Sequence, residues 1–184
     1  KAITAAKAGN PPNIIQTYEV GTQMMWDSPY IVPIEDLAEP GEVDWGDYLS
    51  VVKRYYTNPE GKLVSMPFNS STAILYYNKD MFEEAGLDPN DPPTTYAEMT
   101  EAGRQLLDSG VVDHAITYGW PTWVFEQTHY WTNTNYVNNG NGREKRATKV
   151  LFNEEPGMKI MEKWAEWEEE GILIYGGREY EPDA

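Results

Sequence analysis

Residues 67–89, PFNSSTAILYYNKDMFEEAGLDP, decide how the rest of the chain is interpreted. A turn-forming run passes into a β-rich segment, residues 73–77, for which the sequence predicts a strand. Asn78 is the expected N-cap of a short helix that ends at Gly86. Near the middle of a two-lobed α/β protein, such a segment would carry the chain from one lobe into the other.

Helices and strands are predicted to alternate on both sides of this segment. Before it we expect a strand over 13–20, a short helix over 22–26, and a hairpin over 55–66 with its turn at residues 58–61. After it, the capping box Thr95-x-x-Glu98 begins a helix that ends at Gly110. A strand over 115–119, a loop over 132–142 and a helix over 154–170 capped by Asn153 follow. The buried face of that last helix is predicted to contain Ile160, Met161, Trp164 and Trp167. This alternation favours α/β layers.

The charge of the chain excludes several kinds of partner. Thirty acidic residues against fourteen basic ones give 184 residues a net charge of -16. This charge would repel nucleic acid and anionic membrane surfaces. No apolar run approaches the ~20 residues that span a bilayer. The sequence starts within a helical pattern and stops without a closing element, so we expect both ends to lie inside a longer protein.

Catalytic and metal-binding motifs are not found. The chain has no cysteine, and its two histidines, His114 and His129, lack metal-ligand spacing, so neither a metal nor a cofactor is predicted. Glu19 and Glu126 could form a carboxylate pair for glycoside hydrolysis, but acids are abundant here and nothing in their spacing supports it. A carbohydrate-active hydrolase is therefore kept only as an alternative.

Three single residues and one polar run are candidates for ligand binding. Trp120 and Trp123 follow a predicted strand end, where α/β proteins place ligands and where indole rings stack on sugars or polyols. Alternatively, both rings fill the core. Glu19 ends a predicted strand and its carboxylate could accept two hydroxyl hydrogen bonds, or it is a solvated acid. The polar run 69–72 offers hydroxyls and backbone N–H groups to an anion, or it is an ordinary turn.

The chain resembles ABC-transporter extracellular solute-binding proteins in five sequence blocks and in their order. The blocks are AGNPPNIIQTYEVGT, FNSSTAILYYNKDMFEEAGLDP, PPTTYAEM, YGWPTW and GGR. Within that superfamily, YEVGT, PFNSST and the GW-x-x-W pair are most similar to the receptors for glycerol 3-phosphate and glycerophosphodiesters, which are close relatives of the sugar receptors. The resemblance implies an α/β, periplasmic-binding-protein-like two-lobe fold, present only in part. Residues 1–72 would belong to the N-terminal lobe, and 73–184 would contain the crossover strand and part of the second lobe.

The resemblance also implies roles for single residues. Glu19 resembles the acid that accepts hydrogen bonds from glycerol hydroxyls, and Ser71 the serine that contacts the phosphate. Trp120 and Trp123 resemble paired tryptophans that hold the glycerol carbon chain. Weaker candidates adjoin these positions: Tyr18, Asn69, Ser70 and Thr72. Family members are more than twice this long, and an arginine for the phosphate comes from a portion without a counterpart here.

The function implied is capture of glycerol 3-phosphate or a glycerophosphodiester and its delivery to an ABC permease, without catalysis. A sugar or oligosaccharide receptor of the same superfamily is the alternative. Lobe closure over the solute would replace a reaction. We expect a monomer that lies in the periplasm or outside the cell, with a lipid anchor as an option for the full-length protein. Its partners would be the solute and the transmembrane subunits of the permease, and not nucleic acid.

Overall fold

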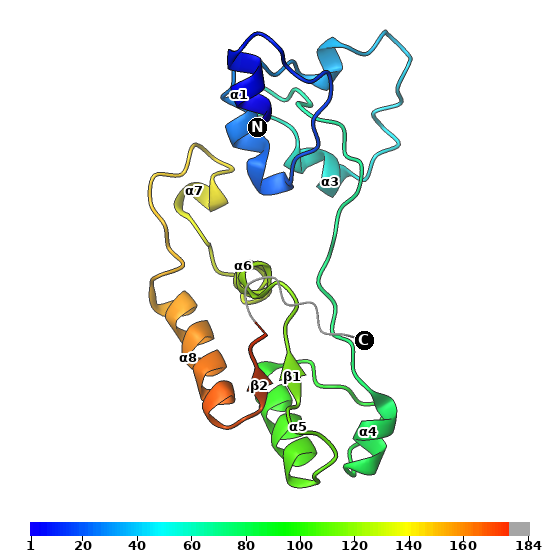
Figure 1. Ribbon diagram of the computed structural model, residues 1–184, viewed down its shortest axis with the longest axis vertical. Helices are drawn as coiled ribbons and strands as arrows, with labels where there is room; N and C mark the ends of the chain where they lie inside the picture. The colour runs from blue at the N-terminus through cyan, green and yellow to red at the C-terminus, as the bar shows by residue number, and fades with distance from the viewer. Residues whose placement is uncertain (177–184) are drawn as a thin grey trace. The chain divides into compact units, whose positions relative to one another are not determined.

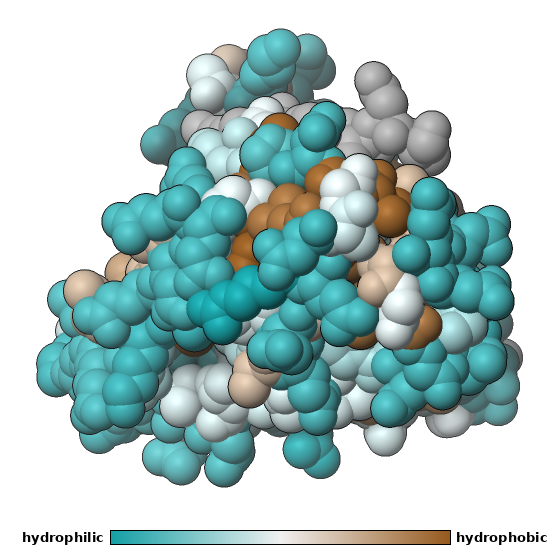
Figure 2. Space-filling model, turned by 90° about the horizontal axis from the view of Figure 1, so that it is seen from below, coloured by the Kyte–Doolittle hydropathy of each residue, from teal (hydrophilic) through white to brown (hydrophobic). Residues whose placement is uncertain are grey.

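The computed structural model describes residues 1–176 (Figure 1). The chain divides into two compact units, Lys1–Thr72 and Ala73–Ala184. In the space-filling view, hydrophilic residues cover most of the visible face and a smaller group of hydrophobic residues lies near its centre (Figure 2).

The first unit is built from short helical segments joined by long irregular stretches. Its elements are α1 (Ala2–Lys7), η1 (Glu19–Gly21), α2 (Thr22–Trp26), η2 (Ile34–Asp36) and α3 (Ser50–Tyr55). Tyr56, Leu63 and Val64 are buried, and Leu63 is only 1 % exposed. The Leu63 N–H donates to Glu35 Oε2 at 2.9 Å and the Ile34 N–H to the Val64 carbonyl at 3.1 Å, so η2 is attached to this small core.

The predicted hairpin of the first unit forms only around its turn. Thr57 and Leu63 make a single antiparallel bridge, and the Lys62 N–H donates to Asn58 Oδ1 at 2.8 Å. Gly61 has φ +84°, a left-handed conformation that glycine adopts without a Cβ penalty. The turn is therefore confirmed, but Tyr55 ends α3 instead of entering a strand.

The predicted strand over 13–20 is wrong. Glu19–Gly21 forms a 3₁₀ turn, and residues 13–18 take no regular structure. Ile14 is 88 % exposed. A strand exists only when its backbone groups pair with a neighbour, and within residues 1–72 no segment pairs with this one.

The second unit contains the longer helices and the one sheet of the described residues. Its elements are α4 (Lys79–Glu84), α5 (Tyr96–Asp108), β1 (Ile116–Thr117), α6 (Pro121–Trp131), α7 (Asn138–Asn141), α8 (Glu155–Glu169) and β2 (Leu173–Ile174). β1 pairs with β2 in parallel, Ile116 opposite Leu173 and Thr117 opposite Ile174. Parallel strands need a long crossover, which α6, α7 and α8 provide here (Figure 1).

Local capping signals explain α4 and α5, and both predictions are confirmed. Asn78 Oδ1 accepts from the N–H groups of Asp80 and Met81 at 3.0 and 3.1 Å. At the start of α5 the Thr95 side chain accepts from the Glu98 N–H while the Glu98 carboxylate accepts from the Thr95 N–H. Each pair satisfies N–H groups that the first turn of a helix leaves without an intrahelical partner.

The core of the second unit joins α5, α6, α8 and β2 through tryptophans. Trp164, Trp167 and Ile172 belong to one buried cluster, and Trp167 is 0 % exposed. Its Nε1–H donates to Thr100 Oγ1 at 2.8 Å, so the buried indole keeps a hydrogen bond. Gly103 allows α5 to pack closely against Ile172, because a Cβ at this position would lie 2.8 Å from Ile172 Cγ2.

Three expectations for this unit are corrected. Residues 73–77 are extended but belong to no strand, because nothing within the described range pairs with them. Helix α8 has Glu154 as its N-cap instead of Asn153, since Glu154 is the extended residue before the first turn. Met161 is 47 % exposed, whereas Ile160, Trp164 and Trp167 are buried as predicted. Helix α6 and strand β2 were not predicted.

Candidate functional site

Trp120 has an unusual backbone at the start of α6. It is the N-cap of the helix with φ 55° and ψ 59°, in the left-handed region. A bulky residue seldom adopts this conformation, which costs roughly 1–2 kcal/mol. The next residue, Pro121, is buried at the first helical position, where proline fits without losing a hydrogen bond. Trp120 therefore combines a rare backbone conformation with the position just before α6.

The two tryptophans differ in exposure. The Trp120 side chain is 44 % exposed, which is not a core position, whereas Trp123 in the first turn of α6 is half-buried. The Trp123 N–H donates to the Trp120 carbonyl at 2.9 Å, so the two residues are held in one turn. Helix α6 is itself anchored by buried Val124, Thr128 and His129. An exposed indole on an anchored helix end is suited to stack on a ligand.

Glu19 lies at the first position of η1 and is half-buried. Burial, and next the nearby Glu19 carboxylate, raise the pKa of Tyr56. Tyr18, the residue before Glu19, is 77 % exposed. A half-buried carboxylate next to an exposed aromatic ring offers both an acceptor and an apolar surface to a polyol.

The polar run 69–72 is exposed and has no regular secondary structure. Asn69, Ser70, Ser71 and Thr72 therefore present their amide and hydroxyl groups to solvent. The run lies in the first unit with Tyr18 and Glu19, whereas Trp120 and Trp123 lie in the second. A common site made from all of them stays a prediction.

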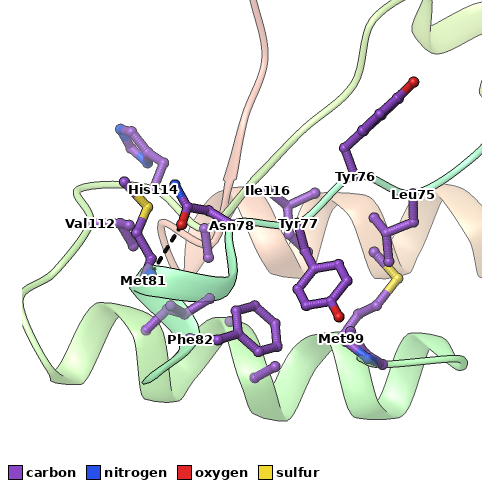
Figure 3. A pocket seen from close by; sticks show the side chains of 15 residues that line it. Leu75, Tyr76, Tyr77, Asn78, Met81, Phe82, Met99, Val112, His114 and Ile116 are labelled. Carbon is purple, nitrogen blue, oxygen red and sulfur yellow. Dashed lines mark hydrogen bonds between the residues drawn. The ribbon is translucent and has the colours of Figure 1, made fainter. Parts of the chain in front are cut away.

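A cavity of about 190 Å³ lies within the second unit, between residues 75–78, α4, α5 and β1. Figure 3 shows the rings of Tyr77 and Phe82 next to each other, with centroids 5.0 Å apart. Met81, Met99 and Ile116 contribute to a largely apolar lining. None of the eight candidate ligand residues lines it. Such a surface suits an apolar group and not a polyol.

The titratable residues near α6 are buried to different degrees. Burial raises the pKa of Glu126, and burial together with the Glu126 charge raises the pKa of Tyr136. His129 is 1 % exposed, and burial lowers its pKa. Its Nδ1 lies 2.8 Å from Thr134 Oγ1, while its Nε2 has no hydrogen-bond partner among residues 1–176. Glu126 and Glu19 belong to different units.

Within the described part of the chain, no group of three or more histidine and acidic side chains could hold a metal ion. His114 uses Nδ1 to contact the Gly171 carbonyl at 2.8 Å. Over the same range, every helix is too short or too polar to cross a bilayer.

The chain matches a known class of protein. The family model of bacterial extracellular solute-binding proteins matches residues 1–175, and the chain belongs to this family. The resemblance seen in the sequence blocks is thereby confirmed; of the GGR block, residues 177 and 178 lie outside the described residues.

Among its relatives are periplasmic proteins that bind sn-glycerol 3-phosphate. The chain is 36 % identical over 180 residues to the sn-glycerol-3-phosphate-binding periplasmic protein UgpB of Agrobacterium fabrum, covering 96 % of this chain and 41 % of that protein. It is 35 % identical over 184 residues to UgpB of Pectobacterium atrosepticum, covering 98 % and 41 %. The chain thus spans about two fifths of the length of the curated relatives it matches.

A solved structure confirms the fold class. The cyclic α-maltosyl-1,6-maltose binding protein of Arthrobacter globiformis matches with a TM-score of 0.68 and 22 % identity, over 96 % of this chain and 44 % of that one. The α/β, periplasmic-binding-protein-like fold, present in part, is therefore as predicted.

Proposed function

We propose that the full-length protein is the solute-binding component of an ABC importer that captures glycerol 3-phosphate or a glycerophosphodiester and delivers it to a membrane permease. The observation that carries this proposal is the similarity to two UgpB proteins over nearly the whole chain. The protein would work in the periplasm or outside the cell, as a monomer, free or held by a lipid anchor. It would bind and release its solute without catalysing a reaction.

In this proposal, different candidate residues bind different parts of the solute. Trp120 and Trp123 hold the glycerol carbon chain against their indole faces, and the exposure of Trp120 supports this role. The half-buried Glu19 carboxylate accepts hydrogen bonds from glycerol hydroxyls, and the exposed Ser71 hydroxyl donates to the phosphate. Their neighbours contribute weaker contacts: Tyr18, Asn69, Ser70 and Thr72.

A sugar or oligosaccharide receptor is the second candidate. An exposed indole stacks on a pyranose ring as readily as on a glycerol chain, and the Arthrobacter globiformis protein is named for a maltose-derived ligand. A hydrolase has no comparable support, since both proteins named among the relatives and the solved structure are described as binding proteins.

The test is a calorimetric titration of the full-length protein with glycerol 3-phosphate, a glycerophosphodiester and a panel of maltooligosaccharides. The proposal expects saturable binding of a phosphoglycerol compound. Glu19→Ala should weaken that binding by about 1.5–3 kcal/mol, the contribution of a charge-assisted hydrogen bond. Glu60→Ala, at an exposed acid of the same unit, is the matched control and should bind as wild type.

Tryptophan emission distinguishes the candidates further. Ligand addition should change the emission, and Trp120→Ala combined with Trp123→Ala should remove most of that change. Trp131→Phe, at the other end of α6, serves as the control. Binding of sugars alone would support the second candidate, and hydrolysis of a sugar that disappears in Glu19→Gln would support the hydrolase.

A further inference from the structure

Basic residues gather in one short part of this acidic chain. Residues 143–149, REKRATK, contain four of its fourteen basic residues against one acid, Glu144, although the net charge of the whole is -16. All seven residues are exposed. We name residues 138–149, which include α7 and this run, the basic loop.

The base of the basic loop is closed by Asn138. Its Oδ1 accepts from the N–H groups of Thr148 and Lys149 at 2.9 and 3.1 Å, and its Nδ2 donates to Thr148 Oγ1 at 3.1 Å. The Asn138 N–H donates to the Lys149 carbonyl at 3.0 Å. An antiparallel bridge between Val137 and Val150 continues this closure outside the loop.

Two further asparagines make side-chain hydrogen bonds to the backbone within and next to the basic loop. Asn139 Nδ2 donates to the Arg146 carbonyl at 2.8 Å, and Asn141 Oδ1 accepts from the N–H groups of Tyr136 and Val137 at 2.7 and 3.1 Å. Asn139, Asn141 and the glycines beside them have positive φ angles, which asparagine and glycine tolerate best. The loop is thus cross-linked by its side-chain amides, and the basic residues are held on a fixed backbone.

We propose that the basic loop is a docking surface for an acidic patch on the membrane subunits of the importer; this rests on the proposed function. Lys149 also pairs with Glu154, and Arg143 and Arg146 take part in interactions within the chain. Complementary charge at an interface steers association and fixes its orientation. A preorganised loop loses little conformational entropy on binding.

The short range of electrostatic interactions in salt solution distinguishes two possible partners of the basic loop, a protein patch and a membrane surface. Charges separated by more than about 8 Å are largely screened at physiological salt, so a small acidic patch interacts with the loop and little with the rest of the chain. An extended anionic membrane would also face the other acidic residues of a chain with net charge -16 and would be repelled by them. The charge pattern therefore favours a protein partner.

The experiment uses the full-length protein and its importer reconstituted in nanodiscs, with solute-dependent ATP hydrolysis as the readout. Lys145→Gln combined with Arg146→Gln should raise the half-saturating receptor concentration by roughly fivefold or more at low salt, and by less at high salt. Solute affinity should not change. Lys79→Gln with Lys159→Gln removes the same charge from exposed positions on α4 and α8 and should behave as wild type.

Each result separates the two proposals. Wild-type stimulation that the loop variant matches at all salt concentrations would overturn the docking surface and leave the proposed function intact. Absence of stimulation by the wild type with any solute would overturn the proposed function and the docking partner with it. Loop-dependent binding to phosphatidylglycerol vesicles, with unchanged stimulation, would assign the loop to lipid and overturn the protein partner.

Discussion

At the scale of single residues, Trp120 combines an exposed aromatic side chain with a backbone conformation that few large residues adopt. Its φ of 55° is followed by the helical turn of α6. Strain of this kind persists only where the surrounding structure imposes it, and it gathers at functional sites. Trp120 is followed by the buried Pro121 and by a helix with three further buried residues.

Because of this strain, we expect the glycine variant at position 120 to be more stable than the alanine variant, the reverse of the usual order in a helix. Trp120→Gly should be more stable than Trp120→Ala by about 1 kcal/mol, because glycine accepts a positive φ without a Cβ clash. At Trp123, inside α6, alanine should be the more stable by about 1 kcal/mol, as in ordinary helices. Urea denaturation of the four variants measures both differences. The same order at both positions would show that Trp120 is unstrained in solution.

At the scale of elements, His129 joins α6 to the segment before the basic loop. Its ring lies against Phe125 and Tyr136, with centroids 5.1 and 5.4 Å away. A Cβ at Gly157, in the first turn of α8, would lie 3.2 Å from His129 Nε2. Protonation at this Nε2 would create a buried charge without a hydrogen-bond partner in the described residues.

A pH dependence of stability follows from this burial. The pKa of His129 is lower in the folded protein than its ordinary value of 6.5, so the unfolded chain binds the proton first as pH falls. Stability is therefore complete above about pH 6.5 and decreases as pH falls toward the folded-state pKa. Phe125, Thr134 and Tyr136 contact the ring, Gly157 lies near its Nε2, and none of these residues is charged at these pH values.

His129→Phe should remove this decrease of stability with falling pH, whatever the substitution does to the stability at neutral pH. His114→Phe is the matched control, because His114 is exposed and is the only other histidine. Urea denaturation of each variant between about pH 5 and 7.5 gives the comparison. An equal slope in wild type and His129→Phe would mean that the buried ring does not titrate differently on unfolding.

Most elements with local capping signals were predicted correctly, whereas two of the predicted strands did not form; the strand predicted over 115–119 is present as β1. The caps at Asn78 and Thr95 act within four residues, so α4 and α5 follow from sequence alone. The strands over 13–20 and 73–77 failed, because a β-rich composition does not say which neighbour pairs with it. Helix α6 was missed although Pro121 at its first position is a typical start signal.

The same division applies to the candidate site. Chain order and motif identify Glu19, Ser71 and the tryptophan pair as candidates. The exposure of Trp120 and its left-handed backbone depend on how α6 packs, and no sequence pattern reports them. Of the basic loop, the sequence predicted only a loop over 132–142; its asparagine hydrogen bonds join residues up to eleven positions apart, and no sequence pattern reports them.

At the scale of the whole molecule, the high net charge lowers the stability of the folded state. With -16 over 184 residues, like charges repel in the folded state more than in the expanded one. The ion pairs between α5 and α8, such as Arg104 with Glu170 at 2.6 Å, are exposed and contribute little against this repulsion.

Screening should therefore stabilise the protein. Raising NaCl from about 10 to 150 mM should increase the thermal midpoint by about 2–4 °C, corresponding to about 1 kcal/mol. Differential scanning calorimetry measures the shift, and sucrose at the same osmolality controls for effects unrelated to charge. A midpoint that falls with salt would show that attractive ion pairs outweigh the repulsion.

Segment 73–77 pairs with no strand among residues 1–176, and this has a consequence for how the protein is handled. Its sequence AILYY is uncharged and without proline, and Ile74, Leu75 and Tyr76 are 65, 52 and 85 % exposed. An extended run of this kind is a template on which a second molecule adds its own strand, the first step toward fibrils. Concentrated stocks should therefore aggregate through this run, and a lysine in place of Tyr76 is the gatekeeper that the structure offers, since its ring contributes nothing to the core.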